Sequence, residues 1–207
     1  MTRQEFDNYP TMRELTWALV DRLPELDPLS TIVEPCAGGL DIVQAITAKL
    51  PDTVYITNDI HPGCACAYTS DAADRDAAVW QQVRALGDRH AGKPEWTITN
   101  PPFKLAHKIL PLALEHSAVG VAFLLRLSYL EPTMKRQARG AWLRAHEDQM
   151  VRLIPFGNPR PWFPPYAKDE TDSVTPAWFV WLKEWSWRAH GIQSPIQFVN
   201  DWLKVQE

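Results

Sequence analysis

Short apolar runs alternate with amphipathic segments along most of this 207-residue chain. The runs are rich in β-branched and aromatic residues and predict strands, whereas the segments between them have the length and spacing of helices. The predicted strands cover residues 31–34, 54–58, 96–99, 119–125, 151–154 and 177–182, with a weaker one just before Ser70. The predicted helices cover residues 12–23, 40–50, 75–86, 105–116, 133–146 and 195–204. This alternation is typical of a doubly wound α/β sheet.

The length suits one domain with a full-sized core, and no repeat or Gly/Ser-rich linker divides the chain. We therefore expect a single domain over residues 1–207. No apolar run approaches the roughly 20 residues that span a bilayer, and the N-terminus lacks the apolar core of a signal peptide. We expect no membrane partner.

Three cysteines, Cys36, Cys64 and Cys66, have no disulfide-framework spacing, which favours free thiols in a reducing cytoplasm. His61 lies close to the second and third of them. Because no fourth ligand follows at metal-site spacing, no metal site is predicted.

Asn100, Pro101, Pro102 and Phe103 directly follow the strand predicted at residues 96–99. The two prolines fix φ near −65° and cannot donate backbone hydrogen bonds. The residue before a proline is pushed out of the helical region, so Asn100 should be extended at the end of the strand. Its side-chain carbonyl, a nearby backbone carbonyl and the aromatic ring suit an exocyclic amine on a planar ring.

Residues 31–40 predict a strand, a tight turn and the start of a helix. The glycines Gly38 and Gly39 permit positive φ and a close approach of a ligand to the backbone. In a doubly wound sheet, ligands bind beyond the carboxyl ends of the strands. Glu34 would repel a phosphate but suit an ammonium group, and no Gly-Lys-Ser/Thr follows the turn.

Residues 99–103 resemble the catalytic motif of amino-methyltransferases that use S-adenosylmethionine (SAM), chiefly those that act on adenine N6. Residues 31–40 resemble the first motif of such enzymes, with Ala37 in place of its usual first glycine. With later stretches at 123–131, 160–163, 171–173 and 177–181, the chain resembles small bacteriophage and prophage N6-adenine DNA methyltransferases over roughly residues 9–185. The resemblance implies a Rossmann-like class I methyltransferase fold: a mostly parallel seven-stranded sheet with an antiparallel last strand and helices on both faces.

The resemblance also implies SAM as the cofactor. Asp59, at the end of the second predicted strand, would accept hydrogen bonds from the ribose hydroxyls. Asp71 would meet the adenine amine of the cofactor, with Asp74 and Asp76 as alternatives. Thr11 would help to cap the methionine end, and could also N-cap the first helix. The predicted cofactor-binding residues are Tyr9, Thr11, Glu34, Pro35, Ala37, Gly38, Gly39, Asp59, Asp71 and Asn100.

The predicted substrate contacts lie mostly in the second half of the chain. Residues 126–168 hold eight basic and three acidic side chains, a net charge of +5, against −9 for the rest of the chain. This suits a polyanionic substrate, although a solvated face of mixed charge is the alternative. We expect a substrate-binding insertion at 131–168. The predicted substrate-binding residues are Phe103, Arg126, Lys135, Arg136, Arg139, Arg160 and Trp162.

Within this set, Phe103 and Trp162 would hold a flipped base, although Trp162 could also be a packing residue. Arg126 would lie near the site at the end of the fifth strand, or act as a structural ion-pair partner. The catalytic group would be Asn100, Pro101, Pro102 and Phe103.

The expected reaction is methyl transfer from SAM to the N6 amine of adenine in DNA, by in-line attack from a flipped-out base. RNA adenine N6-methylation and protein glutamine N5-methylation are the alternatives, followed by an inactive nucleic-acid-binding scaffold. We expect a monomer or homodimer that acts on DNA in a bacterial host cytoplasm.

Overall fold

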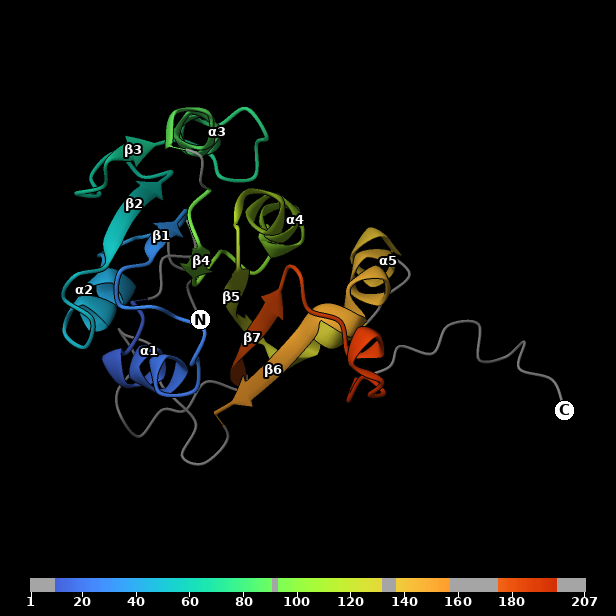
Figure 1. Ribbon diagram of the computed structural model, residues 1–207. Helices are drawn as coiled ribbons and strands as arrows, with labels where there is room; N and C mark the ends of the chain where they lie inside the picture. The colour runs from blue at the N-terminus through green and yellow to red at the C-terminus, as the bar shows by residue number, and fades with distance from the viewer. Residues whose placement is uncertain (1–9, 91–92, 132–136, 157–174, 197–207) are drawn as a thin grey trace, which may run out of the picture.

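The computed structural model describes residues 10–90, 93–131, 137–156 and 175–196. Within them, seven strands form one sheet in the order β3-β2-β1-β4-β5-β7-β6 (Figure 1). The strands are β1 (Thr31–Glu34), β2 (Val54–Asp59), β3 (Tyr68–Thr69), β4 (Trp96–Thr99), β5 (Gly120–Arg126), β6 (Met150–Pro155) and β7 (Pro176–Leu182). All seven predicted strands are present, including the short one before Ser70.

The first five strands pair in parallel, and β7 lies antiparallel to both β5 and β6. The expected mostly parallel sheet with an antiparallel last strand is therefore confirmed. The chain runs outward from β1 to β2 and β3, then returns to the other side of β1 to form β4. This reversal between β1 and β4 is the point at which doubly wound sheets bind ligands.

Helices cover both faces of the sheet. They are α1 (Arg13–Val20), α2 (Asp41–Thr47), α3 (Ala78–His90), α4 (Ala106–His116) and α5 (Gln137–Ala145). Figure 1 shows α1 and α2 on one face and α3, α4 and α5 on the other. The first helix is shorter than predicted, because Pro24 cannot continue a helix and turns follow Val20. The helix predicted at 195–204 lies almost wholly outside the described residues.

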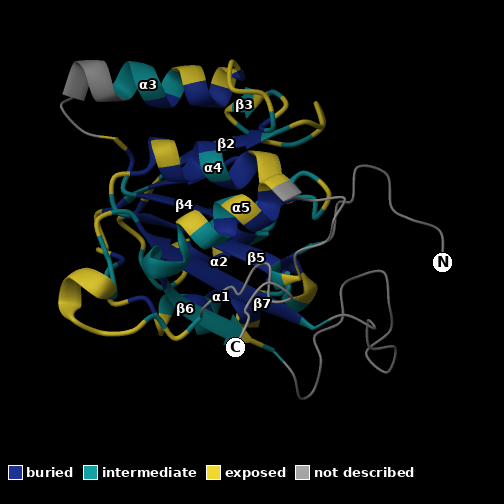
Figure 2. Ribbon diagram, turned by 90° about the vertical axis from the view of Figure 1, so that its right-hand side faces the viewer, coloured by how far each residue is buried: buried dark blue, intermediate teal, exposed yellow. Residues whose placement is uncertain are grey.

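Two apolar layers fill the space between sheet and helices. Adjacent side chains of β5 alternate between them: Phe123 packs toward α3, α4 and α5, and Leu124 toward α1 and α2. Figure 2 shows β5 and β7 buried along nearly all their length. Trp178 and Trp181 of β7 enter opposite layers, as expected of core tryptophans. The Trp178 indole also donates to the Leu15 carbonyl at 2.8 Å, which holds α1 on the sheet.

The cysteine prediction is corrected in part. Cys64 and Cys66 form a disulfide, because the turn after β2 brings their Cα atoms to 5.2 Å, within the usual range for such bonds. Cys36 is a free thiol. Among the described residues, no helix has the length and apolar character needed to cross a membrane.

Candidate active site

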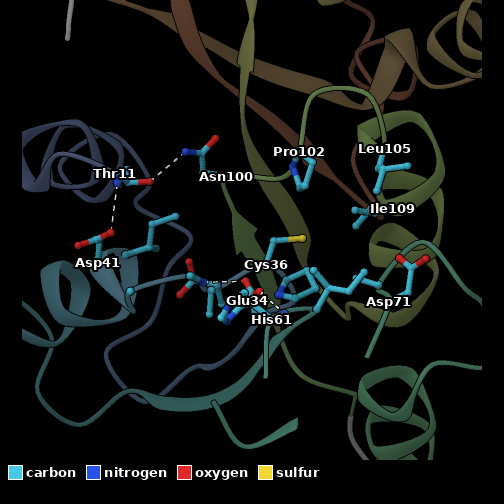
Figure 3. A pocket seen from close by; sticks show the side chains of 18 of the residues that line it. Thr11, Glu34, Cys36, Asp41, His61, Asp71, Asn100, Pro102, Leu105 and Ile109 are labelled. Atoms are coloured by element: carbon cyan, nitrogen blue, oxygen red, sulfur yellow. Dashed lines mark hydrogen bonds between the residues drawn. The ribbon is translucent and has the colours of Figure 1, made fainter. Parts of the chain in front are cut away.

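The described residues form a cleft at the carboxyl ends of β1, β2, β3 and β4 (Figure 3). It therefore lies where the strand order reverses. Ten of the predicted site residues line it: Thr11, Glu34, Pro35, Ala37, Gly38, Gly39, Asp59, Asp71, Asn100 and Pro102. Sequence positions up to 91 residues apart are thus brought to one edge of the sheet.

Other predicted residues lie elsewhere. Pro101 and Phe103 are in the same turn as Asn100 but do not line the cleft. Asp74 and Asp76 do not line it either, which leaves Asp71 as the acidic residue from this stretch. The predictions for Tyr9, Lys135, Arg136, Arg160 and Trp162 fall outside the described residues.

Backbone hydrogen bonds hold the turn after β1 open toward the cleft. The Ala37 amide donates to the Asn58 carbonyl at 2.9 Å. Ala37 is not among the described residues with a positive φ, so an alanine fits the place of the usual glycine without backbone strain. The Gly38 amide donates to the Asp59 carboxylate at 2.9 Å, and Gly38 has a φ of 50°, which glycine adopts without strain. The other Asp59 oxygen accepts from the His61 amide at 2.8 Å. Asp59 therefore joins the turns after β1 and β2.

Asn58 is a supporting residue that the sequence did not identify. It is fully buried, and its side-chain nitrogen donates to the Pro35 and Ser70 carbonyls at 2.9 and 3.0 Å. Its side-chain oxygen accepts from the Ser70 hydroxyl at 2.7 Å. One amide thus joins the turns after β1 and β3. No local pattern distinguishes it from an ordinary polar residue at the end of a strand.

The cleft is acidic. Glu34 is buried, and its Oε2 has no hydrogen-bond partner among the described residues. Burial first, and then the neighbouring Asp41 and Asp59 carboxylates, raise the pKa of Glu34 well above its ordinary value. Asp41, the first residue of α2, lines the cleft but was missed, although acidic residues are common at helix N-termini.

These residues fit SAM better than they fit a nucleotide. Glu34, Asp41, Asp59 and Asp71 supply four carboxyl groups, and no Lys or Arg is among the described residues that line the cleft. A phosphate would be repelled there, whereas a ligand with an ammonium and a sulfonium would offset the buried negative charge. The unpartnered Glu34 oxygen is an acceptor suited to such a cation.

Asn100 directly follows β4, the strand next to β1, and lines the same cleft as the turn after β1. Its side-chain nitrogen donates to the Thr11 hydroxyl at 3.1 Å (Figure 3). The expectation that Thr11 also N-caps α1 is wrong: the N-cap is Met12, which makes no side-chain capping bond. Beyond Asn100, the Pro102 carbonyl accepts from the Leu105 and Ala106 amides, and the chain continues into α4.

Arg126 lies at the end of β5, as predicted, with its guanidinium carbon 4.6 Å from the centre of the Phe103 ring. Phe103 is half-buried and also packs against the apolar core. Arg126 Nε is buried without a hydrogen-bond partner among the described residues. Arg126 therefore already covers one face of the Phe103 ring.

Two other cations of the basic window face inward. Arg139 is buried, donates to the Glu131 carbonyl and lies over the Tyr129 ring at 5.0 Å. Arg152 pairs with Glu25 at 2.8 Å. Arg139 was predicted to bind substrate; the structure turns its side chain from α5 into the protein, where its charge contacts the Glu131 carbonyl and the Tyr129 ring.

The sequence matches no protein-family model and no curated relative. Solved structures are similar in fold. A modification subunit of a putative type I restriction enzyme from Vibrio vulnificus has a TM-score of 0.59 and 11% identity, covering 86% of this chain and 45% of that one. The type I restriction-modification methyltransferase subunit from Streptococcus thermophilus has a TM-score of 0.57 and 12% identity, covering 83% and 43%. TrmN from Thermus thermophilus has a TM-score of 0.52 and 17% identity, covering 84% and 49%.

This chain spans slightly less than half the length of each of these three proteins. At identities this low, the TM-scores show a shared fold and no more. Together with the strand order and the antiparallel β7, they establish that the chain has the Rossmann-like class I methyltransferase fold.

Proposed function

We propose that this protein transfers a methyl group from SAM to the N6 amine of adenine in DNA, with the target base turned out of the helix. The observation that carries the proposal is the position of Asn100. The Asn-Pro-Pro-Phe turn opens onto the same acidic cleft as the Glu34–Gly39 turn, Asp59 and Asp71. This arrangement supports the binding of a methyl donor and an amine acceptor side by side.

Three acidic residues and one turn would hold the cofactor. Glu34 suits the ammonium of the methionine part, Asp59 suits the ribose hydroxyls, and Asp71 suits the adenine amine. Gly38 and Gly39 let the ligand approach the backbone closely. When bound, SAM supplies an electrophilic methyl group on a positively charged sulfur.

Asn100 and Pro101 would act on the amine. The lone pair of an adenine amine is delocalised into the ring, which makes the nitrogen a poor nucleophile. Hydrogen bonds from the amine to Asn100 Oδ1 and the Pro101 carbonyl would draw the nitrogen toward tetrahedral geometry. Positioning two reactants in this way can lower a barrier by roughly 7–11 kcal/mol. Cys36 is half-buried, and burial together with the nearby Asp59 and Glu34 carboxylates raises the pKa of its thiol, which favours the less reactive protonated form.

DNA is the proposed substrate for three reasons. The Asn-Pro-Pro-Phe turn suits a planar conjugated amine, and the sequence resembles phage-type N6-adenine DNA methyltransferases over most of its length. Arg126 stacks beside the catalytic turn, where a planar guanidinium can meet a base face or a phosphate. The excess of basic residues over 126–168 supports a polyanion, although Arg139 and Arg152 make internal contacts.

The test is transfer of radiolabelled methyl groups from SAM to unmethylated duplex DNA, followed by digestion and identification of the labelled nucleoside. We expect N6-methyladenine with the parent protein and none with Asn100→Ala. Asn100→Asp is the matched variant: it keeps an acceptor oxygen, so it should retain part of the activity.

Parallel reactions with single-stranded RNA and with glutamine-containing peptides separate the alternatives. Label in RNA but not in DNA would indicate an RNA adenine methyltransferase, and label in peptide alone would indicate a glutamine methyltransferase. An Asn100→Ala protein that methylates as fast as the parent would contradict the central role of this turn. If the parent does not bind SAM in calorimetry, the methyltransferase proposal fails.

A further inference from the structure

The catalytic amide is connected to α2 through a threonine from the N-terminal segment. Asn100 Nδ2 donates to Thr11 Oγ1 at 3.1 Å, across 89 residues of sequence. The Thr11 amide in turn donates to Asp41 Oδ2 at 3.3 Å. Thr11 is itself buried. Asp41, Thr11 and Asn100 therefore form a chain of hydrogen bonds that crosses one end of the cleft (Figure 3).

The two ends of an asparagine amide are chemically opposite, since the oxygen accepts and the nitrogen donates. The torsion that turns the amide is broad, so covalent geometry alone does not hold it in one orientation. An amine substrate needs the oxygen: with the amide reversed, N–H groups would face N–H groups. Figure 3 shows the Asn100 amide nitrogen turned toward Thr11 and the oxygen pointing away from it.

We infer that Thr11 is a positioning residue for catalysis: its hydroxyl holds the Asn100 side chain in the orientation that presents Oδ1 to the target amine. This inference rests on the proposed function. It differs from capping the methionine end of the cofactor, because the hydroxyl acts on the catalytic amide. Asp41 fixes Thr11 through the backbone, so the side chain of Thr11 is left to accept from Asn100.

Two substitutions isolate the hydroxyl. Thr11→Val keeps the size and branching but removes the acceptor, whereas Thr11→Ser keeps the acceptor and loses a methyl group. We expect kcat to fall about tenfold in Thr11→Val, the effect of losing one buried hydrogen bond in the transition state. The calorimetric Kd for SAM should stay within about twofold of the parent value, and Thr11→Ser should recover most of the kcat.

Thr16→Val is the matched control. Thr16 is fully buried on α1, and its hydroxyl has no hydrogen-bond partner among the described residues. Removing this hydroxyl should leave kcat unchanged. A fall in kcat as large as that of Thr11→Val would show that loss of any buried hydroxyl from this region slows the enzyme, and would overturn the inference.

A second measurement does not depend on activity. The side-chain amide protons of Asn100 give one pair of signals in a proton–nitrogen correlation spectrum, which the Asn100→Ala variant identifies by its loss. We expect this pair to shift in Thr11→Val and to stay near its parental position in Thr11→Ser. An unmoved pair in Thr11→Val would overturn the inference.

The kinetic pattern separates the possible roles. A rise in the Kd for SAM with unchanged kcat would assign Thr11 to cofactor capping and overturn positioning. If the parent methylates no DNA, RNA or peptide, the proposed function fails, and the amide signals alone then decide whether Thr11 orients Asn100.

Discussion

The proposed cofactor side and the proposed substrate side of this molecule differ in how closely the structure follows what the local sequence predicted. On the cofactor side, the turn residues Glu34, Gly38 and Gly39 and the acidic Asp59 and Asp71 all line one cleft. On the substrate side, Arg126 covers Phe103, and Arg139 turns into the protein. Turn geometry is a local property of the chain, whereas the direction of a long cationic side chain depends on what packs around it.

The net charge of a sequence window does not measure the charge that is exposed to a partner. Residues 126–168 carry a net charge of +5, but Arg152 is paired with Glu25 and Arg139 is buried. The acidic cleft is the opposite case. Its carboxyl groups are few, yet they converge because the strand ends of a parallel sheet meet at one edge.

The largest effect is expected on the cofactor side, from Asp59→Ala. This change removes the acceptor of the Gly38 and His61 amides and the predicted acceptor of the ribose hydroxyls. Affinity for SAM should fall about a hundredfold, because charged hydrogen bonds contribute about 1.5–3 kcal/mol each. Calorimetry measures the Kd. Asp52 is exposed in the turn before β2, and Asp52→Ala loses the same charge. This control variant should bind SAM with the parental Kd.

A folded Asp59→Ala protein with parental SAM affinity would contradict the role assigned to this carboxylate. It would mean that the turn after β1 holds its shape, and its ligand, without the carboxylate.

A pH dependence is expected at Glu34, whose pKa is raised by burial above the ordinary 4.5. The folded protein holds this proton more tightly than the unfolded chain does, so stability should decline as pH rises from 4.5 through the raised pKa. Glu34→Gln removes that decline, and thermal unfolding across the pH window measures it. If the stability of the parent and of Glu34→Gln changed with pH in the same way across this window, the raised pKa of Glu34 would be contradicted.

The same residue should couple SAM binding to a proton. A cationic ligand favours the charged Glu34, so affinity should increase with pH and binding should release a proton. Glu34→Gln should lose this dependence and bind about tenfold more weakly at neutral pH. Calorimetry in buffers of different ionisation enthalpy counts the protons, and equal counts for parent and variant would contradict the prediction.

On the substrate side, Arg126→Ala should raise the KM for DNA about fivefold and leave the Kd for SAM unchanged. The size corresponds to the loss of one contact of about 1 kcal/mol between the guanidinium and a base face or a phosphate of the substrate. Arg126→Lys should not restore the KM, because an ammonium lacks the planar stacking surface. Full rescue by lysine would indicate that charge alone matters at this position.

The smallest effect on DNA binding is expected from Arg139→Met. The side chain is committed to the Glu131 carbonyl and the Tyr129 ring, so its loss should cost about 1–3 kcal/mol of stability. The slope of the logarithm of the DNA association constant against the logarithm of the salt concentration should be the same in Arg139→Met as in the parent. A phosphate contact would instead reduce that slope by about 0.9, and such a reduction would reinstate Arg139 as a substrate residue.

Much of the fold was predictable because its strands are short, apolar and separated by helix-length segments. The bounds of β1 and β4 agree with prediction to the residue. At the site, two contacts that the sequence did not predict join residues far apart in the chain. Asn58 joins turns that follow different strands, and Thr11 bonds to Asn100 instead of capping α1. Neither contact has a periodic or local pattern that a sequence could display.

By itself, the sequence determined the alternation of strands and helices, the rigid Asn-Pro-Pro-Phe turn and the glycine-containing turn after β1. Each depends on backbone preferences of adjacent residues. Packing between separate elements brings Asp41 into the cleft, sets the hydrogen bond between Asn100 and Thr11, and buries Arg139. These outcomes depend on side chains from separate elements, and their distances are set only when the helices pack on the sheet.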